Sequence, residues 1–219
     1  MNYAETSIES AYRIEITRKA IHLCSLSIPI AYFFIPRDLA LTILVPAAVL
    51  AIAIDIGRYY IPGLHGWFYA TFGSLLRPHE SDSEKKRLSG ASYVMISAAL
   101  SVFFFPKLVA ITGFAILIIG DMFAALVGRR YGRHKFGNKS LEGSTAFFLT
   151  GVIIMALIPK IEYRLSEYLI GVFSVAVGAI VEALPIPLDD NLSIPLAVGI
   201  TMWACYHYLL PMVDVMRWG

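Results

Sequence analysis

Long apolar runs alternate with short polar segments along nearly the whole chain. This pattern predicts a protein built from membrane-spanning helices. We count about seven such runs, several of them shorter than the roughly 20 residues that cross a bilayer unaided. They cover residues 20–35, 39–61, 90–105, 108–128, 145–158, 168–184 and 192–210.

The segment at 64–76 has clustered aromatic residues and little charge, which is typical of a helix lying in the plane of the membrane surface. The predicted fold class is therefore all-α: a polytopic membrane protein with about seven transmembrane helices plus one interfacial amphipathic helix. We expect a single domain over residues 1–219, with an N-terminal cytoplasmic segment at 1–15 and a cytoplasmic interfacial loop at 62–89. The first residues lack a signal-peptide cleavage pattern, so the first span is expected to remain.

Composition supports a membrane protein and excludes an ordinary soluble domain. Hydrophobic residues make up 58% of the 219 positions and charged residues 16%, and the mean hydropathy is +0.68. One soluble core of this length could not bury so much apolar surface. Both cysteines, Cys24 and Cys205, lie within apolar runs, which supports neither a disulfide framework nor a cysteine metal site.

The distribution of the 18 Lys and Arg residues predicts the orientation. Alternating the spans places 13 of them on one side and five on the other, and the positive-inside rule assigns the richer side to the cytoplasm. The N-terminus is then cytoplasmic, and we expect an integral protein of a bacterial inner membrane. The unusual polar residues, which were not used to set this topology, fall mainly on the same side.

Asp121 is the clearest candidate for chemistry, because an ionisable group inside a span is costly and usually functional. It precedes Arg129 by eight residues, about 12 Å of helix, which is too deep for a short carboxylate to reach water. Small residues recur every fourth position on the same helix: Gly120, Ala124, Gly128 and Gly132. Two plainer interpretations stay open: Asp121 pairs with a buried arginine, and the small residues serve helix packing.

A second acidic group lies between the sixth and seventh runs. Glu182 ends a helical face that also carries Ser174 and Gly178, and a proline-broken loop then adds Asp189, Asp190 and Asn191. These oxygen ligands suit a hard cation such as Mg²⁺. The predicted metal ligands are Asp121, Glu182, Asp189, Asp190 and Asn191. The alternative is a polar turn in which Asp190 or Asn191 caps the last helix.

A cationic segment rich in glycine follows the fourth run. Its cations are Arg129, Arg130, Arg133, His134, Lys135 and Lys139. Cations on flexible backbone suit a polyphosphate cradle, although an extra residue before Lys139 and a preceding apolar helix exclude a Walker A loop. The predicted nucleotide-binding residues are Arg129, Arg133, Lys139, Ser140, Glu142, Gly143 and Ser144. An ordinary positive-inside loop would explain the arginines but not the KSLEGS stretch.

Two further polar groups open or close a span. Arg18, Lys19 and His22 present donors at the inner end of the first run, where they could position a phosphate or simply set the topology. Asp55 and Arg58 are three residues apart and are interpreted as a local ion pair.

The ordered motifs RKAIH, KRLSGASYV, GDMFAALVGRRYG, KSLEGSTAFF and EALPIPLDDNLSIPL resemble the CTP-dependent lipid-alcohol kinases, which include dolichol kinase, phytol kinase and the CTP-dependent diacylglycerol kinase. The likeness runs from about Arg18 to Leu196. It implies transfer of the γ-phosphate of CTP, with Mg²⁺, to the hydroxyl of a membrane lipid alcohol. Phosphatidate cytidylyltransferase shares the helix containing Gly120 and Asp121, but the other motifs of that family do not follow here.

On this resemblance the catalytic residues are Asp121, Glu182 and Lys139, with one of the two carboxylates accepting the hydroxyl proton. Two alternatives from other classes are a cytidylyltransferase that makes a CDP-lipid and a membrane transporter without turnover. The expected partners are a nucleoside triphosphate, a lipid alcohol and the membrane, without nucleic acid. The sequence leaves the oligomeric state open.

Overall fold

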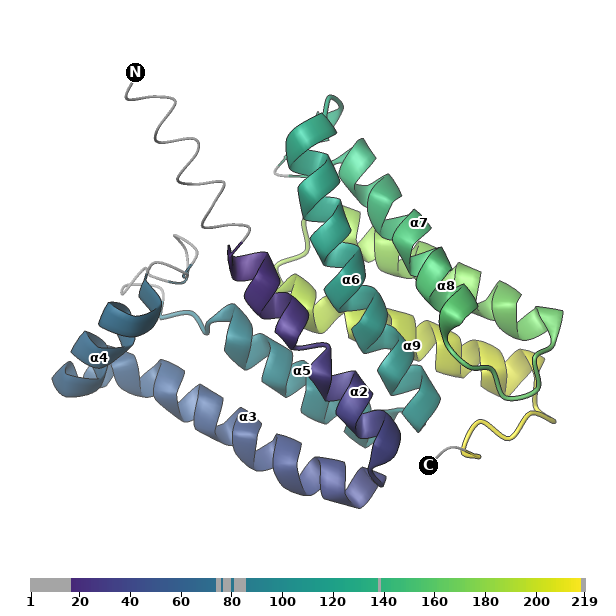
Figure 1. Cartoon of the computed structure of the whole chain (residues 1–219), viewed down its shortest axis with the longest axis horizontal. Coiled ribbons are helices and arrows are strands. Elements are labelled where there is room, and N and C mark those ends of the chain that lie inside the picture. The colour runs from purple at the N-terminus through teal and green to yellow at the C-terminus, as the bar shows by residue number, and fades with distance from the viewer. Residues whose placement is uncertain (1–16, 74–75, 77–79, 81–85, 138, 218–219) are drawn as a thin grey trace.

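The structure, a computed structural model, describes residues 17–73, 76, 80, 86–137 and 139–217. Helices make up nearly all of this part of the chain, as predicted, together with a short antiparallel hairpin in which Lys135 pairs with Ser140 (Figure 1). The elements are α2 (Ser27–Phe34), α3 (Arg37–Tyr60), α4 (Pro62–Phe72), α5 (Gly90–Phe104), α6 (Lys107–Tyr131), β1 (Lys135–Phe136), β2 (Lys139–Ser140), α7 (Leu141–Leu157), α8 (Leu165–Ala183) and α9 (Asp190–Leu209).

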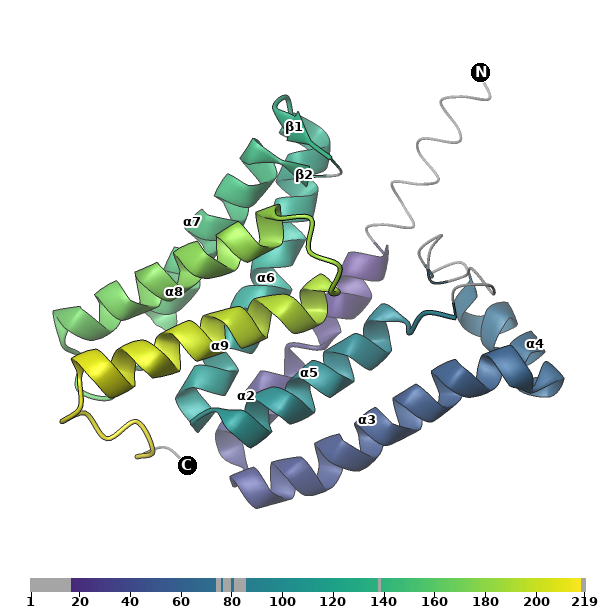
Figure 2. The ribbon, with the colours of Figure 1, turned by 180° about the vertical axis from the view of Figure 1, so that it is seen from behind.

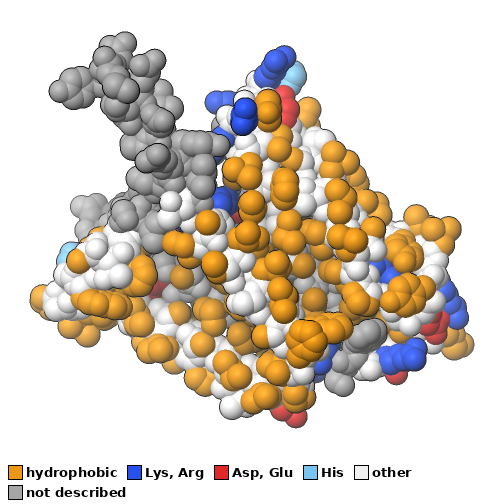
Figure 3. All heavy atoms as spheres, in the orientation of Figure 1, with side chains coloured by type: hydrophobic (Ala, Val, Ile, Leu, Met, Phe, Trp, Pro, Cys, Tyr) orange, Lys and Arg blue, Asp and Glu red, His pale blue; other side chains and the backbone are white. Residues whose placement is uncertain are grey.

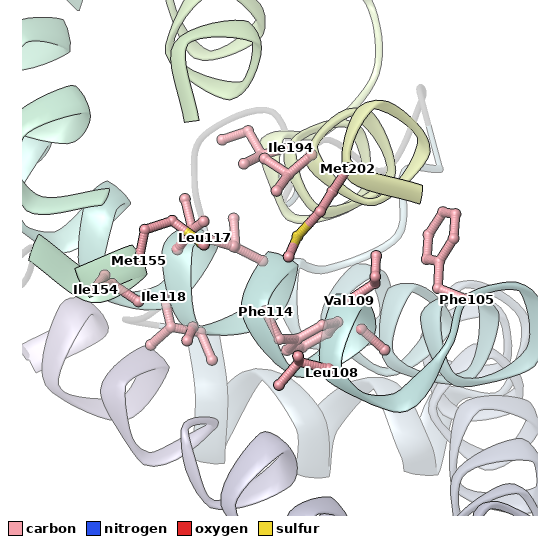
Figure 4. Packing of buried hydrophobic residues seen from close by; sticks show 14 of the residues in the cluster. Phe105, Leu108, Val109, Phe114, Leu117, Ile118, Ile154, Met155, Ile194 and Met202 are labelled. Carbon is pink, nitrogen blue, oxygen red and sulfur yellow. The ribbon is translucent and has the colours of Figure 1, made fainter. Parts of the chain in front are cut away.

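Helix α6 forms the centre of the molecule and contacts α2, α5, α7 and α9. Its residues from Leu108 to Gly120 are apolar or uncharged on all sides, which is the pattern of a helix buried by its neighbours. Ile116, Leu117 and Ile118 of α6 are fully buried. Figure 4 shows Leu117 and Ile118 near side chains from α7 and α9, among them Met155 and Met202. The core therefore surrounds α6.

The outer helices expose wide apolar faces. On α3, for example, Val49 and Leu50 are 60% and 61% exposed. Figure 3 shows hydrophobic side chains over most of the face in view, with charged groups gathered near its edges. Among the described residues, four helices are long and apolar enough to span a membrane: α3, α6, α8 and α9. Exposed apolar helix faces of this kind match a hydrocarbon solvent.

The count of seven full spans is not confirmed. Helices α5 and α7 are apolar but have only 15 and 17 residues. The first predicted span, 20–35, is broken into a helical segment at 17–24 and the eight-residue α2, with a turn at Ser25 and Leu26 between them. Pro29 explains the break, because it has no N–H to donate to the carbonyl of Ser25 and its ring crowds that carbonyl.

The helix predicted at 64–76 forms over Pro62–Phe72 as α4. Only Ile61 separates it from α3, and Figure 1 shows it turning away from the end of that helix. Phe68 is buried against the protein, whereas Trp67 and Phe72 are 53% and 39% exposed. These exposed aromatic rings are of the kind that helices use at a membrane surface.

The small-residue stripe of α6 serves helix packing. A Cβ added at Gly120 would lie 2.8 Å from the ring of Phe147 on α7, and one added at Gly128 would lie 3.4 Å from the Cα of Gly143. Helices α6 and α7 thus touch backbone to backbone along this stripe. The structure therefore favours the interpretation that these small residues serve helix packing.

The far end of the bundle is held by a buried carboxylate, Glu167. Its oxygens accept the backbone N–H groups of Ile161, Glu162 and Arg164 at 2.8–3.0 Å and the hydroxyl of Tyr206 at 3.1 Å. Lys160, also buried, donates to backbone carbonyls at the end of α7. These contacts fix the connection between α7 and α8 at the end of the molecule opposite the hairpin.

We predict that Gly143→Ala destabilises the fold. The new methyl group would lie 2.9 Å from the carbonyl oxygen of Ala124, and backbone at a helix contact cannot give way without separating α6 from α7. Overpacking of this kind costs about 1–3 kcal/mol, which lowers Tm by roughly 3–10 °C in a chain of this size. Tm is measured on the purified protein in detergent.

Gly66→Ala is the matched control, because a Cβ at Gly66 meets nothing within 4 Å. It should leave Tm unchanged or raise it slightly through better helix propensity. Equal Tm values for the two variants would contradict the proposed close contact.

Candidate functional site

One ammonium group joins two carboxylates at the hairpin end of the bundle. Lys139 Nζ donates to Glu182 Oε1 and to Asp190 Oδ2, each at 2.8 Å. These residues come from β2, the end of α8 and the start of α9. Figure 2 shows the hairpin beside the end of α8. The structure thus brings together three predicted site residues that are up to 51 positions apart in sequence.

Local sequence explains why these side chains meet. Gly137 adopts a positive φ of 59° in the hairpin turn, where a residue without a Cβ is favoured. Ser140 then caps α7 by accepting the N–H of Gly143 at 3.1 Å, so Lys139 projects from a fixed backbone just before the cap. On the other side, α8 ends at Ala183 ahead of two prolines, and Asp189 caps α9.

Both oxygens of Glu182 are used, since Ser144 Oγ donates to Oε2 at 2.8 Å. Glu182 is 3% exposed, so its charge depends on these partners. Burial alone would lower the pKa of Lys139, but the charges and hydrogen bonds of Asp190 and Glu182 outweigh it and hold that pKa above its ordinary value. The stabilisation is therefore present at neutral pH and is lost only as the pH rises through the raised pKa.

A second ion pair lies beside the first. Lys19 Nζ donates to the side chain of Asp121 and, at 3.3 Å, to its backbone carbonyl, and His22 Nε2 is 3.9 Å from Asp121 Oδ2. Asp121 therefore pairs with a lysine from the first helical segment. Asp190 interacts electrostatically with the charges of both Asp121 and Asp189, so the two pairs form one polar region.

A cleft of about 780 Å³ opens at this region. Its walls include Arg87, Tyr93, Phe136, Lys139 and residues 183–190. The volume lies in the range of small-molecule sites, and a lining of apolar and aromatic groups with a few charged ones is typical of them.

The other predicted site residues have different surroundings. Arg129 and Arg133 are exposed at the end of α6 and in the following turn. Glu142 pairs with His134 at 2.8 Å on the surface, away from Lys139, and Ser140 and Gly143 pack in the contact between α6 and α7. Arg18 is half-buried on the same segment as Lys19, and Asn191 is buried with its N–H bonded to Asp189.

The acidic residues fit a metal that arrives with a substrate. Within the described residues, no group of three or more His, Cys, Asp or Glu side chains is arranged to hold a metal ion. Glu182 and Asp190, however, already share one cationic partner. Because Mg²⁺ is commonly held by one or two carboxylates plus waters and substrate phosphates, this pair fits a magnesium–nucleotide complex better than a metal cage made by the protein alone.

Several residues at the site were not assigned a role from the sequence. Arg87 and Tyr93 lie in the stretch KRLSGASYV. Its polar residues indicated a position at the cytoplasmic interface, but nothing in the stretch predicted that it lines a cleft. Phe136 carried no signal, since one aromatic residue in a basic loop has no distinctive spacing.

We predict that Lys139→Met creates a cation site. Without the ammonium, two adjacent carboxylates lose the cation that they share, so millimolar Mg²⁺ should stabilise the variant more than the parent protein. A cation present at a few times its Kd contributes about 1 kcal/mol, or about 2–4 °C in Tm. Lys135→Met, which removes an exposed lysine of β1, should respond to Mg²⁺ as the parent does. Equal Mg²⁺ shifts in all three proteins would contradict the assignment.

Comparison with known proteins gives relatives but no family profile and no solved structure. The chain is 29% identical over 188 residues to an uncharacterized protein of Rickettsia prowazekii, a match that covers 85% of this chain and 92% of the relative. It is 28% identical over 170 residues to CTP-dependent diacylglycerol kinase 1 of Schizosaccharomyces pombe, covering 71% and 74% of the two chains.

It is also 31% identical over 137 residues to a probable chloroplastic phytol kinase 1 of Oryza sativa. That match covers 55% of this chain and 43% of the rice protein, so the chain spans less than half the length of this relative. The homologues of this chain thus include phytol kinases and CTP-dependent diacylglycerol kinases, which supports the CTP-dependent lipid kinase family predicted from its motifs.

Proposed function

We propose that this protein is a kinase that transfers the γ-phosphoryl group of CTP to the hydroxyl of a membrane lipid alcohol, such as an isoprenoid alcohol or a diacylglycerol. The names of its relatives support a CTP-dependent lipid kinase. The observation that carries the proposal is that Glu182 and Asp190 share Lys139 beside a cleft of about 780 Å³ that Lys139 and Asp190 line.

Phosphoryl transfer depends on positioning and on neutralising phosphate charge. Lys139 turns from the two carboxylates to the phosphates when the nucleotide enters, and Arg129 and Arg133 add positive charge nearby. Magnesium bound with the nucleotide would neutralise phosphate charge, and Glu182 and Asp190 are the carboxylates that would hold it. Ser144 keeps Glu182 oriented during this exchange.

The acceptor hydroxyl reacts beside Asp121. The hydroxyl oxygen of the lipid bonds to the γ-phosphorus of CTP. At the same time the bond from that phosphorus to the β,γ-bridging oxygen breaks, so that CDP leaves and a lipid phosphate forms. The hydroxyl proton passes to a carboxylate, Asp121 or Glu182. Lys19 holds Asp121 in place, and His22 and Arg18 lie near enough on the same segment to orient the acceptor or the phosphates.

The proposed site faces the cytoplasm of a bacterial inner membrane. Lys139, Asp190 and Arg87 gather at the end of the bundle that the positive-inside rule assigns to that side. The opposite end carries Lys160 and Glu167, whose polar groups are bonded to backbone and to Tyr206.

The test is a screen of the purified protein in nanodiscs against farnesol, phytol, polyprenols and diacylglycerol, with each labelled nucleoside triphosphate. The expected products are CDP and a lipid phosphate from one acceptor class. Release of pyrophosphate with a CDP-lipid would identify a cytidylyltransferase instead. Absence of turnover with every combination of acceptor and nucleotide would reject the kinase and favour the membrane transporter.

Asp121→Asn should lower kcat by about 10²-fold or more, since a lost general base typically costs 10²–10⁴. Size-exclusion chromatography and Tm in detergent confirm that the variant remains folded. Asp38→Asn is the matched control, because Asp38 is an exposed carboxylate at the far end of α3 and should leave kcat unchanged. Retained activity in Asp121→Asn would remove this residue from the mechanism.

A further inference from the structure

Arg58 is the largest fully buried side chain that carries a charge, among the residues that the structure describes. It lies at the inner end of α3, and one guanidinium nitrogen donates to the backbone carbonyls of Glu80 and Arg87, both at 3.0 Å. The hydroxyl of Tyr59 bonds to the same two carbonyls at 3.2 and 2.7 Å. The backbone that enters α5 is therefore held from α3.

The same guanidinium supports α4. Its carbon lies 4.6 Å from the centre of the Phe68 ring, within the range of a cation–π contact. His65 Nδ1, also on α4, lies 3.2 Å from the backbone carbonyl of Arg58. Arg58 thus joins α4 on one side to the segment before α5 on the other.

Asp55 fixes the next residues of that segment. Its Oδ2 accepts the N–H and the hydroxyl of Ser89, both at 2.7 Å, and the hydroxyl of Ser92 at 2.5 Å. The preceding residues, Arg87 and Leu88, line the cleft together with Lys139. The position of the Arg87 side chain at the cleft therefore depends on backbone that Arg58 and Asp55 hold.

Helix α4 has the features of a helix at a membrane surface. It follows the spanning helix α3 after one residue, and it exposes Trp67 and Phe72, while Tyr60 beside it is 66% exposed. Aromatic side chains at the end of a span are typical of the membrane interface. Phe68, on the protein side of α4, contacts the Arg58 guanidinium directly.

We propose that Arg58 is a positioning residue that couples the seating of α4 on the lipid surface to the placement of Arg87 in the cleft. Arg87 then adds a cation to the wall of the cleft, where it contributes to nucleotide binding. Only this last step rests on the proposed kinase function. The coupling itself is a property of the contacts and can be measured without turnover.

Hydrogen–deuterium exchange in lipid nanodiscs tests the coupling. Arg58→Lys keeps the charge but cannot hold two carbonyls and a ring at once, and Phe68→Ala removes the contact from α4 alone. Both should speed exchange of the 86–93 peptide by tenfold or more. Arg217→Lys, at an exposed arginine near the C-terminus, is the control and should leave exchange unchanged.

Unchanged exchange in Arg58→Lys overturns the proposal. Faster exchange in Arg58→Lys with no change in Phe68→Ala also overturns it, because the link to α4 is then missing. If Arg58→Lys does not fold, the exchange rates of Phe68→Ala and Tyr59→Phe decide the test instead. Tyr59→Phe removes only the hydrogen bonds from the tyrosine hydroxyl to the same two carbonyls, so it should speed exchange of the 86–93 peptide by less than Phe68→Ala does.

A double-mutant cycle tests how Arg58 acts on the nucleotide. Arg58→Lys and Arg87→Ala should each raise the KM for the nucleotide about tenfold with kcat within twofold, and the double variant should match Arg87→Ala alone. Multiplied effects, or a loss confined to kcat, would overturn a role through Arg87. Absence of turnover in the parent protein rejects the kinase proposal alone, since the exchange experiment still decides the coupling.

Discussion

A negative charge at membrane depth costs free energy unless a cation lies beside it, and this constraint organises the inner end of the molecule. Asp121 forms an ion pair with Lys19, which is 102 positions away, and Glu182 forms one with Lys139, which is 43 positions away. Each pair joins segments that are distant in sequence. The contact that neutralises each carboxylate therefore also fixes its orientation. The same ion pairs thus compensate the buried charge and bring the site residues together.

The apolar middle of the bundle explains why the polar groups lie at its ends. The middle of helix α6 is apolar and packed against its neighbours, and the helix touches α7 closely through Gly128 and Gly143. Such packing leaves little room for charged side chains away from the two ends of the bundle, and Asp121, which lies deeper in α6, is paired with Lys19. One end is closed by Glu167, which is saturated by backbone donors. The other end, around Lys139, opens into the cleft.

The sequence predicts where charged side chains lie within apolar runs, but it does not predict which side chains they contact. A carboxylate in an apolar run is conspicuous, so Asp121 and Glu182 could be found from hydropathy alone. Their partners could not, because periodicity gives the face of a helix but not the neighbour on that face. The pairing of Glu142 with His134 depends on a short hairpin whose strands have two residues each, and such short strands leave no hydrophobic pattern in the sequence. Likewise, the broken first span depends on one proline, at position 29, within an otherwise apolar run.

The two ion pairs of the site differ in how deeply they are buried, and therefore in how easily they can be broken. The side chains of Lys19 and Asp121 are 8% and 15% exposed, whereas those of Lys139 and Asp190 are 30% and 29% exposed. Breaking a buried pair costs about 3–5 kcal/mol and a fully solvent-screened pair contributes about 0–1 kcal/mol, so the pair of Lys139 and Asp190 lies between these limits. The side chain of Glu182 is only 4% exposed, so another cation has to replace Lys139 there when the lysine moves. We therefore expect Lys139 to exchange carboxylate for phosphate while Lys19 remains on Asp121. An acceptor that reaches Asp121 then reacts at a carboxylate whose position is already fixed by an intact ion pair.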